Sequence, residues 1–370
     1  MATNGQRNQP EWEDFVHTGP GTLAGRFMRR FWHPIYRSAS LLAGRGVPIR
    51  IMSEDFTLYR GESGVPHLLA FRCAHRGTQL STGWVEGDTL RCFYHGWVYG
   101  PDGQCLEQPA EPVPFCQRIK IRSYPTQEYL GLVFAYLGAE ESPVLPRYPE
   151  FESGDTLRVT AYIRECNFFN NIENGVDWAH VPFTHRGTLG NYAAGDLGGV
   201  GARENAYGVV TARELGDRRL SLLEFGMPNV LLRREVRRSF HALAWRVPID
   251  DESHYSFNLD LQVGDESTSH PPRMVNVPGR HAPSAQIRAI LAGELSIDTT
   301  EDRSEIVNLQ DSVAQIGQGV IPDRQSERLG HSDLPIIAVR NVWVRELRAL
   351  AEGRPLKQWT RADEPLVAAR

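Results

Sequence analysis

The sequence has little net charge, few cysteines and no long hydrophobic run. Its net charge of −5 and its scattered arginine pairs give no reason to expect a nucleic-acid partner. No apolar stretch approaches the length of a membrane-spanning helix. The polar, acidic first residues (MATNGQRNQPEWEDF) do not have the pattern of a secretory signal. We therefore predict a soluble, cytoplasmic protein without a membrane partner.

What is present is the composition of a globular protein. Hydrophobic residues make up 41% and charged residues 23% of the chain, which allows sizeable cores. A length of 370 residues suits about two domains of ordinary size.

The most informative stretch contains two Cys–His pairs. Cys73 and His75 are separated by one residue, Cys92 and His95 by two, and sixteen residues lie between the pairs. Two thiolates on one iron and two imidazoles on the other are the ligand set of a Rieske [2Fe–2S] cluster. Neutral imidazoles in place of anionic thiolates raise the reduction potential, so such a cluster suits one-electron relay.

Three other interpretations explain the pattern less well. A Cys2His2 zinc site usually places both cysteines before both histidines, whereas here they alternate. A Cys73–Cys92 disulfide would leave both histidines unexplained and would suit a secreted chain. Buried cysteines beside surface histidines would make the spacing a coincidence. The remaining cysteines, Cys105, Cys116 and Cys166, are predicted to be free thiols in a reducing cytoplasm.

The distribution of β-rich and helical segments predicts an α+β fold. Short strands separated by Gly, Pro and Asp turns run from about 48 to 140, which fits a small antiparallel barrel or sandwich. A second antiparallel sheet is expected over 200–263, a loop over 268–290, and helices from 301 onward. The predicted divisions are an N-terminal extension that packs on the catalytic domain (1–24), an all-β cluster domain (25–145) and the catalytic domain (146–370).

A second group of metal-ligand side chains lies in the segment NNIENGVDWAHVPFTHR. Glu173, Asp177 and His180 have the spacing of one helix face, and His185 follows in the next turn. Two histidines and one carboxylate that leave open positions form the facial triad of non-haem Fe(II) oxygenases.

The local structure of this segment is predicted from its proline. Pro182 should end or kink the helix near Val181, which would let His185 turn back toward His180. Two histidines at this spacing are weak evidence alone, and a solvated helix face is the alternative. An upstream carboxylate that orients a metal-bound histidine strengthens the metal-site interpretation.

Together the two motifs resemble the catalytic α subunit of Rieske non-haem iron ring-hydroxylating oxygenases. The segments FWHPIY, CAHRG, NFFNNIEN and QDSVAQIGQGVIPDRQSERLGHSD resemble the phthalate dioxygenase branch, and the resemblance covers nearly the whole chain. It implies a helix-grip catalytic domain, a Rieske cluster, a mononuclear Fe(II) and dioxygen as co-substrate. It also implies NAD(P)H electrons delivered by a flavin-containing iron–sulfur reductase, with or without a ferredoxin.

The resemblance implies a third iron ligand from an aspartate late in the chain. The candidates are Asp302, Asp311 and Asp323, and the match to the branch pattern selects Asp311. The apolar residues of this segment form a helical stripe at Ile306, Leu309, Val313 and Ile316. Asp311 projects away from that stripe, whereas Asp302 lies along it. A solvated aspartate is the alternative interpretation.

The resemblance also implies an electron path between chains. Asp177 matches the carboxylate that links a mononuclear-site histidine to a cluster histidine of a neighbouring subunit, here His180 to His95. Such a path needs head-to-tail closure, and a homotrimer is expected. Glu173 either tunes Asp177 or has a purely structural role. Exposed members of the group Arg72, Arg76 and Trp97 could form part of the reductase docking surface, with loop packing as the alternative.

The substrate is predicted only by class. The branch favours mono- or dioxygenation of an aromatic carboxylate or related compound in aromatic catabolism, with O- or N-demethylation or ether cleavage as the alternative. Candidate pocket residues are Asn170, Asn174, Phe183 and Tyr192. Candidate partners for a carboxylate are Arg186, Arg203 and Arg234. A Rieske electron-transfer protein without oxygenase activity, or a zinc-binding structural protein, would leave the second motif as coincidence.

Overall fold

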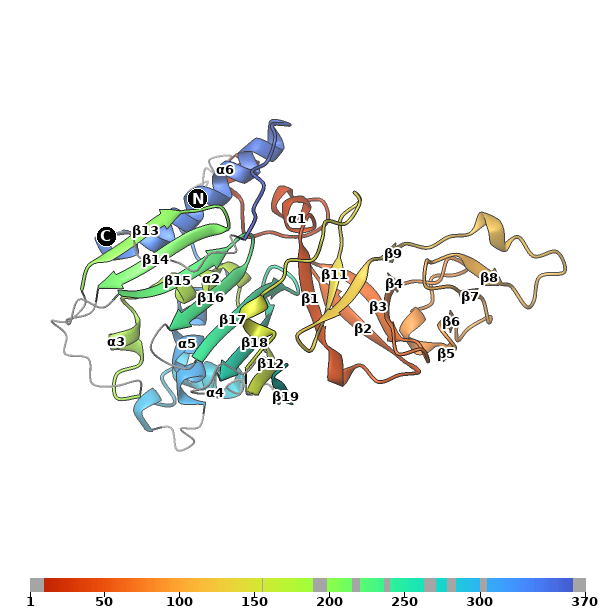
Figure 1. The fold of residues 1–370 in the computed structure, drawn as a ribbon, viewed down its shortest axis with the longest axis horizontal. Helices are drawn as coiled ribbons and strands as arrows, with labels where there is room; N and C mark the ends of the chain where they lie inside the picture. Colours follow the sequence, from red (N-terminus) through yellow and green to blue (C-terminus); the bar gives the residue numbers. More distant parts are fainter. Residues whose placement is uncertain are drawn as a thin grey trace, which may run out of the picture. The chain divides into compact units, whose positions relative to one another are not determined.

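The computed structural model describes residues 10–154, 156–188, 198–214, 220–235, 240–262, 271–277, 284–299 and 305–361. The chain divides into two compact units (Figure 1). One unit is Met28–Tyr148. The other combines the residues up to Phe27 with those from Pro149 onward.

The unit Met28–Tyr148 is built from short antiparallel strands. One sheet has the order β1-β11-β10, with bounds Trp32–Arg37, Leu132–Tyr136 and Thr126–Tyr129. A second has the order β2-β3-β4-β9, with bounds Arg45–Ile51, Glu54–Arg60, Pro66–Ala70 and Ser123–Tyr124. A third has the order β5-β6-β7-β8, with bounds Trp84–Glu86, Thr89–Arg91, Val98–Tyr99 and Cys105–Glu107. Its 3-10 helices are Ser38–Ser40, Leu80–Thr82 and Cys116–Arg118.

The short sheets bring the two Cys–His pairs together. The first pair lies in the loop after β4, and the second lies in the loop between β6 and β7. The cysteines of both pairs belong to a buried cluster that also contains Leu80, Leu90 and Trp97. Both loops are therefore anchored to one hydrophobic core.

The other unit contains one large sheet. Its strand order is β13-β14-β15-β16-β17-β18-β12-β19, antiparallel throughout except for the parallel pair β12–β19 (Figure 1). The bounds of β12 to β15 are Thr156–Arg164, Val200–Glu204, Gly208–Glu214 and Leu220–Gly226. Those of β16 to β19 are Val230–Glu235, Phe240–Pro248, His254–Gln262 and Arg273–Asn276.

Helices pack against this sheet. The α-helices α1 to α6 are Leu23–Met28, Phe168–Val176, Val181–Thr184, Ser284–Leu291, Ile306–Gly317 and Leu334–Ala351. The 3-10 helices are Glu11–Glu13, Pro149–Phe151, Ile297–Thr299 and His331–Asp333. α2 contacts β17 and also α5 and α6, while α6 contacts β13 and β14. A sheet with helices on it, preceded by an all-β unit, confirms the predicted α+β class.

Aromatic packing fixes α2 against the C-terminal helix. Trp343 of α6 is fully buried and makes edge contacts with Phe168 and Phe169 of α2 and with Phe27 of α1. Aromatic pairs of this kind add to the burial of a large apolar area. α2, which leads into the second motif, is therefore held rigidly.

Two further features bear on the predictions. The prediction of a loop over 268–290 is wrong in part, because β19 adds to the sheet beside β12 and α4 packs on α5. No helix in the described part of the chain combines the length and the hydrophobicity that a membrane span requires.

Candidate active site

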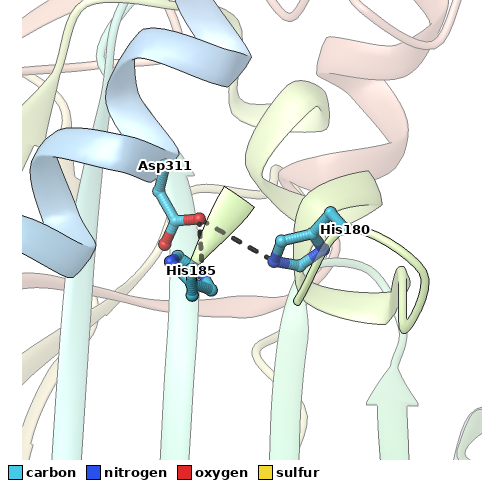
Figure 2. A group of neighbouring side chains, drawn as sticks. All are labelled: His180, His185 and Asp311. Atoms are coloured by element: carbon cyan, nitrogen blue, oxygen red, sulfur yellow. Dashed lines mark ion pairs between the residues drawn. The ribbon is translucent and has the colours of Figure 1, made fainter. Parts of the chain in front are cut away.

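Three metal-ligand side chains meet around one point beside α3 and α5. Nε2 of His185 lies 3.3 Å, and Nε2 of His180 3.8 Å, from the same Asp311 oxygen (Figure 2). One ligand atom from each residue lies within 4.8 Å of the other two. Ligand atoms about 2.1 Å from one ion lie about 3 Å from one another, so this group can hold a divalent metal.

The helix break at Asp177 corrects one prediction. Glu173, Asp177 and His180 do not share a helix face, because α2 ends at Val176 and Asp177 has an extended backbone (φ −77°, ψ 117°). The Asp177 carboxylate accepts the N–H of Ala179 at 2.7 Å. Such a local side-chain bond stabilises a turn in place of the next helical turn.

A one-turn helix places the two histidines on either side of it. α3 spans Val181–Thr184, with Pro182 in its first turn, His180 before it and His185 after it. The prediction that Pro182 ends a helix is therefore wrong, since it begins one. Proline is tolerated in a first turn because its missing N–H would have no helical partner there.

The apolar stripe of α5 turns Asp311 toward the histidines. Ile306 and Leu309 are buried against Ile287 of α4, with further apolar side chains of both helices packed around them. Asp311 lies on another side of α5, where Nδ2 of Asn174 is 3.4 Å from its Oδ1. This arrangement follows the periodicity seen in the sequence.

The other aspartate candidates differ from Asp311. Asp323 is exposed, accepts the N–H of Gln325 at 3.2 Å, and is not part of the group that His180 and His185 form. Asp302 lies outside the described residues.

A glutamine not foreseen from the sequence orients His185. Nδ1 of His185 is 3.0 Å from Oε1 of Gln310, which also accepts the hydroxyl of Thr188 at 3.2 Å. Because an amide oxygen only accepts, Nδ1 carries the proton of the neutral ring, which leaves Nε2 as the nitrogen available to a metal. This is the tautomer that a metal ligand needs.

On the other histidine, the ring nitrogen remote from Asp311 faces a carboxylate. Nδ1 of His180 lies 3.5 Å from Oδ2 of Asp177. This buried nitrogen has no hydrogen-bond partner among the described residues. His180 thus has a carboxylate near each ring nitrogen.

The charges of the group fit a metal site. Burial alone would lower the pKa of His185, but the hydrogen bonds that the protonated ring can donate to Asp311 and Gln310 raise it. Burial alone would raise the pKa of Asp311, but the hydrogen bond to His185 and the charge of Arg164 lower it. Asp311 is therefore held as a carboxylate, the form that binds a cation.

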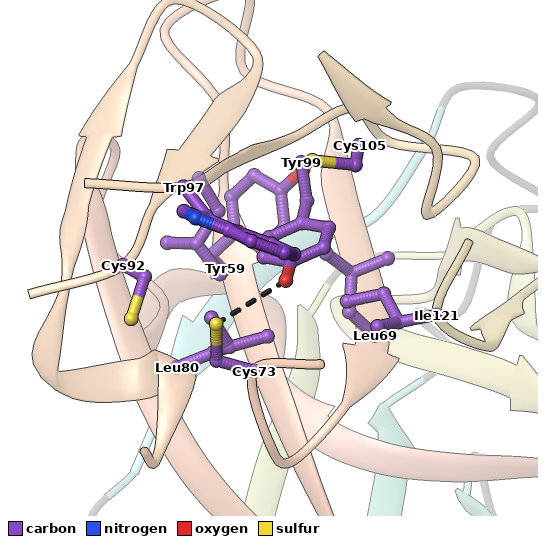
Figure 3. Close-up of a cluster of buried hydrophobic side chains, with 10 residues drawn as sticks. Tyr59, Leu69, Cys73, Leu80, Cys92, Trp97, Tyr99, Cys105 and Ile121 are labelled. Atoms are coloured by element: carbon purple, nitrogen blue, oxygen red, sulfur yellow. Dashed lines mark hydrogen bonds between the residues drawn. The ribbon is translucent and has the colours of Figure 1, made fainter. Parts of the chain in front are cut away.

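The four residues of the first motif converge from two loops. Cys73 and Cys92 are buried, and Figure 3 shows their sulfurs on facing loops. The rings of His75 and His95 are 4.5 Å apart, and His75 stacks on Trp97 at 4.7 Å. Nδ1 of His75 is buried without a hydrogen-bond partner among the described residues. A buried nitrogen beside two thiols fits a cluster ligand, because leaving it unbonded is costly.

The two loops share one backbone pattern. The N–H of Gly77 donates to the carbonyl of Cys73 at 2.9 Å, and that of Gly96 donates to Cys92 at 3.1 Å. Both glycines have positive φ, +75° and +72°. The Tyr99 hydroxyl lies 3.2 Å from the sulfur of Cys73, a contact not foreseen from the sequence. A hydroxyl that donates to a cluster ligand raises the potential of the cluster.

The comparisons with known proteins cover both motifs. Residues 31–125 match the family described as Rieske [2Fe-2S] domain. The oxygenase subunit of a 5,5'-dehydrodivanillate O-demethylase from Sphingobium sp. is 31% identical over 364 residues, covering 93% of this chain and 81% of that protein. The phenoxybenzoate dioxygenase subunit alpha of Ectopseudomonas oleovorans is 32% identical over 361 residues, covering 90% and 84%.

The chain belongs to the Rieske non-haem iron oxygenases. It is an oxygenase subunit that uses a Rieske cluster, a mononuclear iron, dioxygen and NAD(P)H electrons passed through a reductase. The fold agrees with solved structures. The carbazole 1,9a-dioxygenase oxygenase in a ferredoxin complex gives a TM-score of 0.67 at 20% identity, covering 92% of this chain and 93% of that one.

In this Rieske oxygenase, Glu173 is held by two arginines. Its buried carboxylate pairs with Arg324 at 3.0 Å and with Arg340 at 2.6 Å. Among the described residues, Glu173 meets Asp177 through the main chain, where the N–H of Asp177 donates to the Glu173 carbonyl at 3.0 Å. These contacts favour the structural role of Glu173 over the tuning role.

Several residues predicted for the substrate pocket have other environments. Asn170 donates to the carbonyls of Gln315 and Gly319, and Phe183 is 58% exposed. Among the members of the predicted set that the structure describes, Asn174 is the one whose side chain hydrogen-bonds to a triad side chain. Tyr192 and the side chain of Arg234 lie outside the described residues, and Arg186 and Arg203 are exposed.

The remaining predicted residues lie in the cluster unit or are cysteines. Arg72 and Arg76 are exposed, whereas Trp97 is buried against His75 and cannot form a docking surface. The cysteines outside the motif are free thiols: Cys105, Cys116 and Cys166.

Proposed function

We propose that this Rieske oxygenase hydroxylates an aromatic carboxylate or a related aromatic compound at an iron held by His180, His185 and Asp311. The observation that carries the proposal is the convergence of these three side chains from separate segments within 4.8 Å. Two imidazoles and one carboxylate leave coordination positions for dioxygen next to a substrate.

The electron path of the proposal runs from the cluster ligands Cys73, His75, Cys92 and His95. When bound, the cluster supplies single electrons and the iron activates dioxygen beside the substrate. Asp177 is the proposed bridge, because its carboxylate already lies 3.5 Å from His180. Its other contact would be His95 of a neighbouring copy, in a homotrimer closed head to tail.

The proposal also covers the redox partner, the cellular compartment and the roles of the two units. A flavin and iron–sulfur reductase, directly or through a ferredoxin, would supply the electrons; solved relatives include oxygenase–ferredoxin complexes. We place the protein in the cytoplasm, because the cysteines outside the cluster motif, Cys105, Cys116 and Cys166, form no disulfide and free thiols persist in a reducing compartment. We propose the unit Met28–Tyr148 as the cluster domain and the other unit as the catalytic domain.

O-demethylation or ether cleavage is the second candidate. The 31% identical relative is named as an O-demethylase, and phthalate 4,5-dioxygenase of Pseudomonas putida is 25% identical over 89% of this chain. Hydroxylation of a carbon next to an ether oxygen uses the same iron site, so the substrate and not the triad decides between the two outcomes.

Metal content tests the proposal. The holoenzyme should contain about three irons and two acid-labile sulfides per chain, with a Rieske-type EPR signal after reduction. Asp311→Ala should retain the cluster but fall to about two irons, because two imidazoles alone hold Fe(II) weakly. The matched control Asp323→Ala, at an exposed aspartate, should keep all three. Three irons in Asp311→Ala would contradict the ligand assignment.

A further inference from the structure

Two buried arginines lie on the large sheet, and neither has a carboxylate partner in the part of the chain that the structure describes. Arg164 ends β12 and is 4% exposed, and Arg246 lies in β17 and is 9% exposed. Among the described residues, neither guanidinium has a carboxylate within 4 Å, whereas the similarly buried Arg29 lies 3.3 Å from Glu54.

The hydrogen bonds of the two guanidiniums are few. Arg164 reaches the hydroxyl of Tyr162 at 3.5 Å and Oδ1 of Asn308 at 3.4 Å. Arg246 reaches Oδ1 of Asn258 at 2.9 Å and the carbonyl of Trp245 at 3.4 Å. The Nε–H of each arginine is buried and has no hydrogen-bond partner among the described residues.

Such an arrangement is costly unless a counter-charge is supplied. A buried guanidinium cannot lose its proton, and its unpaired N–H groups lose their hydration without replacement. Burial lowers the pKa of Arg246, while Tyr162 and the more distant Asp311 and Asp260 oppose that shift. Two cations with incomplete pairing on one surface form a binding site for an anion.

Strand pairing puts both arginines on the sheet face near the metal triad. Tyr162 pairs with Ser256, and Ser256 pairs with Arg246, so these side chains lie in one row across three strands. Arg164, two residues after Tyr162, points to the same face because side chains alternate along a strand.

That face is turned toward α2 and α5. Asn171 of α2 donates to Ser256 at 3.2 Å, and Arg164 contacts Asn308 of α5. Asn308 lies one turn before Asp311 on that helix. The arginine pair is thus on the side of the sheet from which Asp311 faces the histidines.

Tyr162 lies near both cations. The Arg164 guanidinium is 5.5 Å from the centre of its ring. Burial would raise the pKa of Tyr162, but the charges of Arg164 and Arg246 outweigh it and lower that pKa. Its hydroxyl is therefore in a strongly positive environment, where it favours a bound anion.

We propose that Arg164 and Arg246, with the hydroxyl of Tyr162, bind a carboxylate group of the substrate. The proposal rests on the proposed function, because it assigns the residues that recognise the substrate at that site. It replaces the exposed Arg186 and Arg203 as the partners of a substrate carboxylate. Two guanidinium forks match the planar carboxylate, and the aromatic part then lies on the side of the metal triad.

Binding of matched acids and esters tests this assignment. The probes are 3-phenoxybenzoate, 3-chlorobenzoate and phthalate, each with its methyl ester, titrated calorimetrically into oxidised holoenzyme without reductant. We expect at least one acid to bind at least about ten-fold more tightly than its ester, because charge-assisted hydrogen bonds are lost in the ester.

Variants locate the effect. Arg164→Gln and Arg246→Gln should each bind the acid only about as tightly as its ester. Arg246→Lys should keep part of the preference for the acid. The control Arg288→Gln changes an exposed arginine on α4 that pairs with Glu165, and should keep the full preference. The visible spectrum of the cluster and the melting temperature identify any variant that fails to fold, in which case the Lys variant carries the test.

Three results would overturn the assignment: equal binding of acids and esters, no binding of any acid, or an undiminished preference in both Gln variants. None of these depends on turnover. An enzyme with three irons that consumes oxygen with a neutral aromatic would keep the proposed oxygenase function while losing this assignment. An iron count of two together with the expected preference for acids would contradict the proposed iron site while keeping the carboxylate assignment.

Discussion

At the scale of single residues, Asp177 is where the proposed electron path can be interrupted without loss of either metal centre. Its carboxylate faces Nδ1 of His180 and also caps the turn at Ala179. Asp177→Asn keeps an oxygen for the turn but removes the negative charge. We expect full iron and sulfide content with substrate-dependent oxygen consumption reduced at least about 100-fold.

The measurement is single-turnover reduction and reoxidation of the cluster, followed optically with substrate present. Asp177→Glu is the matched variant that keeps the charge, and it should recover part of the rate. Normal turnover with stoichiometric product in Asp177→Asn would contradict the bridge.

Most of the proposed ligand residues could be selected from sequence because the chemistry needs particular residue types at particular spacings. Cys73, His75, Cys92 and His95 are candidates of this kind, whereas Asp311 was selected by the family resemblance, with its position off the stripe of α5 as additional support. Gln310 and Tyr99 could not be selected. A glutamine next to an aspartate and a tyrosine in a strand carry no signal until the fold brings them to His185 and Cys73.

At the scale of elements, the two cluster loops have the same backbone but different space around their glycines. A Cβ on Gly96 would lie 3.2 Å from Cγ of Pro109, whereas a Cβ on Gly77 would meet nothing within 4 Å. Both positions have a left-handed backbone, which costs an alanine about 1 kcal/mol. We predict that Gly77→Ala pays only this cost, while Gly96→Ala also strains the contact with Pro109.

The rate at which each variant loses its cluster after dilution into a chelator at moderate temperature measures the difference between the two substitutions. Gly96→Ala should lose its visible absorbance several-fold faster than Gly77→Ala, and Gly77→Ala only slightly faster than the unaltered protein. The reverse order would show that the space around the two loops does not control cluster retention.

The break between α2 and α3 shows why helical periodicity failed locally. The spacing of Glu173, Asp177 and His180 fits a continuous helix, and nothing in that spacing marks its end. The break arises because the Asp177 side chain takes the N–H of Ala179. Asp is a residue type that competes for backbone donors in this way, so its presence was the available signal.

At the scale of the whole molecule, each unit contains a fully buried neutral histidine, which predicts acid sensitivity. Burial lowers the pKa of His33 to about 4 and that of His254 to about 3. Nδ1 of His254 lies 2.8 Å from the carbonyl of Cys166, and its Nε2 lies 2.8 Å from the amide of Asn171. Both ring nitrogens are therefore occupied in the neutral form.

The sign of the pH dependence follows from these lowered pKa values. Between about pH 6.5 and pH 4 the unfolded chain binds a proton at each histidine that the folded chain does not. As the pH is lowered through this range, the free energy of unfolding should therefore decrease by up to about 1.4 kcal/mol per pH unit for each histidine. Urea unfolding at pH 7.5 and 5.5 measures it. His254→Gln should show a shallower dependence, and His331→Gln, at an exposed histidine, an unchanged one.

The arginine pair belongs to this scale because only the complete sheet brings it together. Arg164 and Arg246 lie in strands far apart in the sequence, and β18 joins them by pairing with both β12 and β17. In the sequence Arg164 shares its strand with Arg158 and Arg246 lies among apolar residues, and a charge in a strand is easily read as an edge or a solvent-facing position. Their relation to the metal triad depends on long-range pairing and could not be inferred from spacing.

The last prediction concerns the assembly. If electrons pass from His95 of one copy to His180 of the next, Cys92→Ser and Asp311→Ala chains should each be inactive alone but should restore activity when co-expressed. Random mixing at equal amounts leaves about a quarter of the junctions with both a working cluster and a working iron site, so about a quarter of the normal activity is expected.

Transfer within a single chain would give no activity, because no chain in the mixture has both centres. Mixing the purified homo-oligomers without co-expression is the control, and it should stay inactive unless subunits exchange.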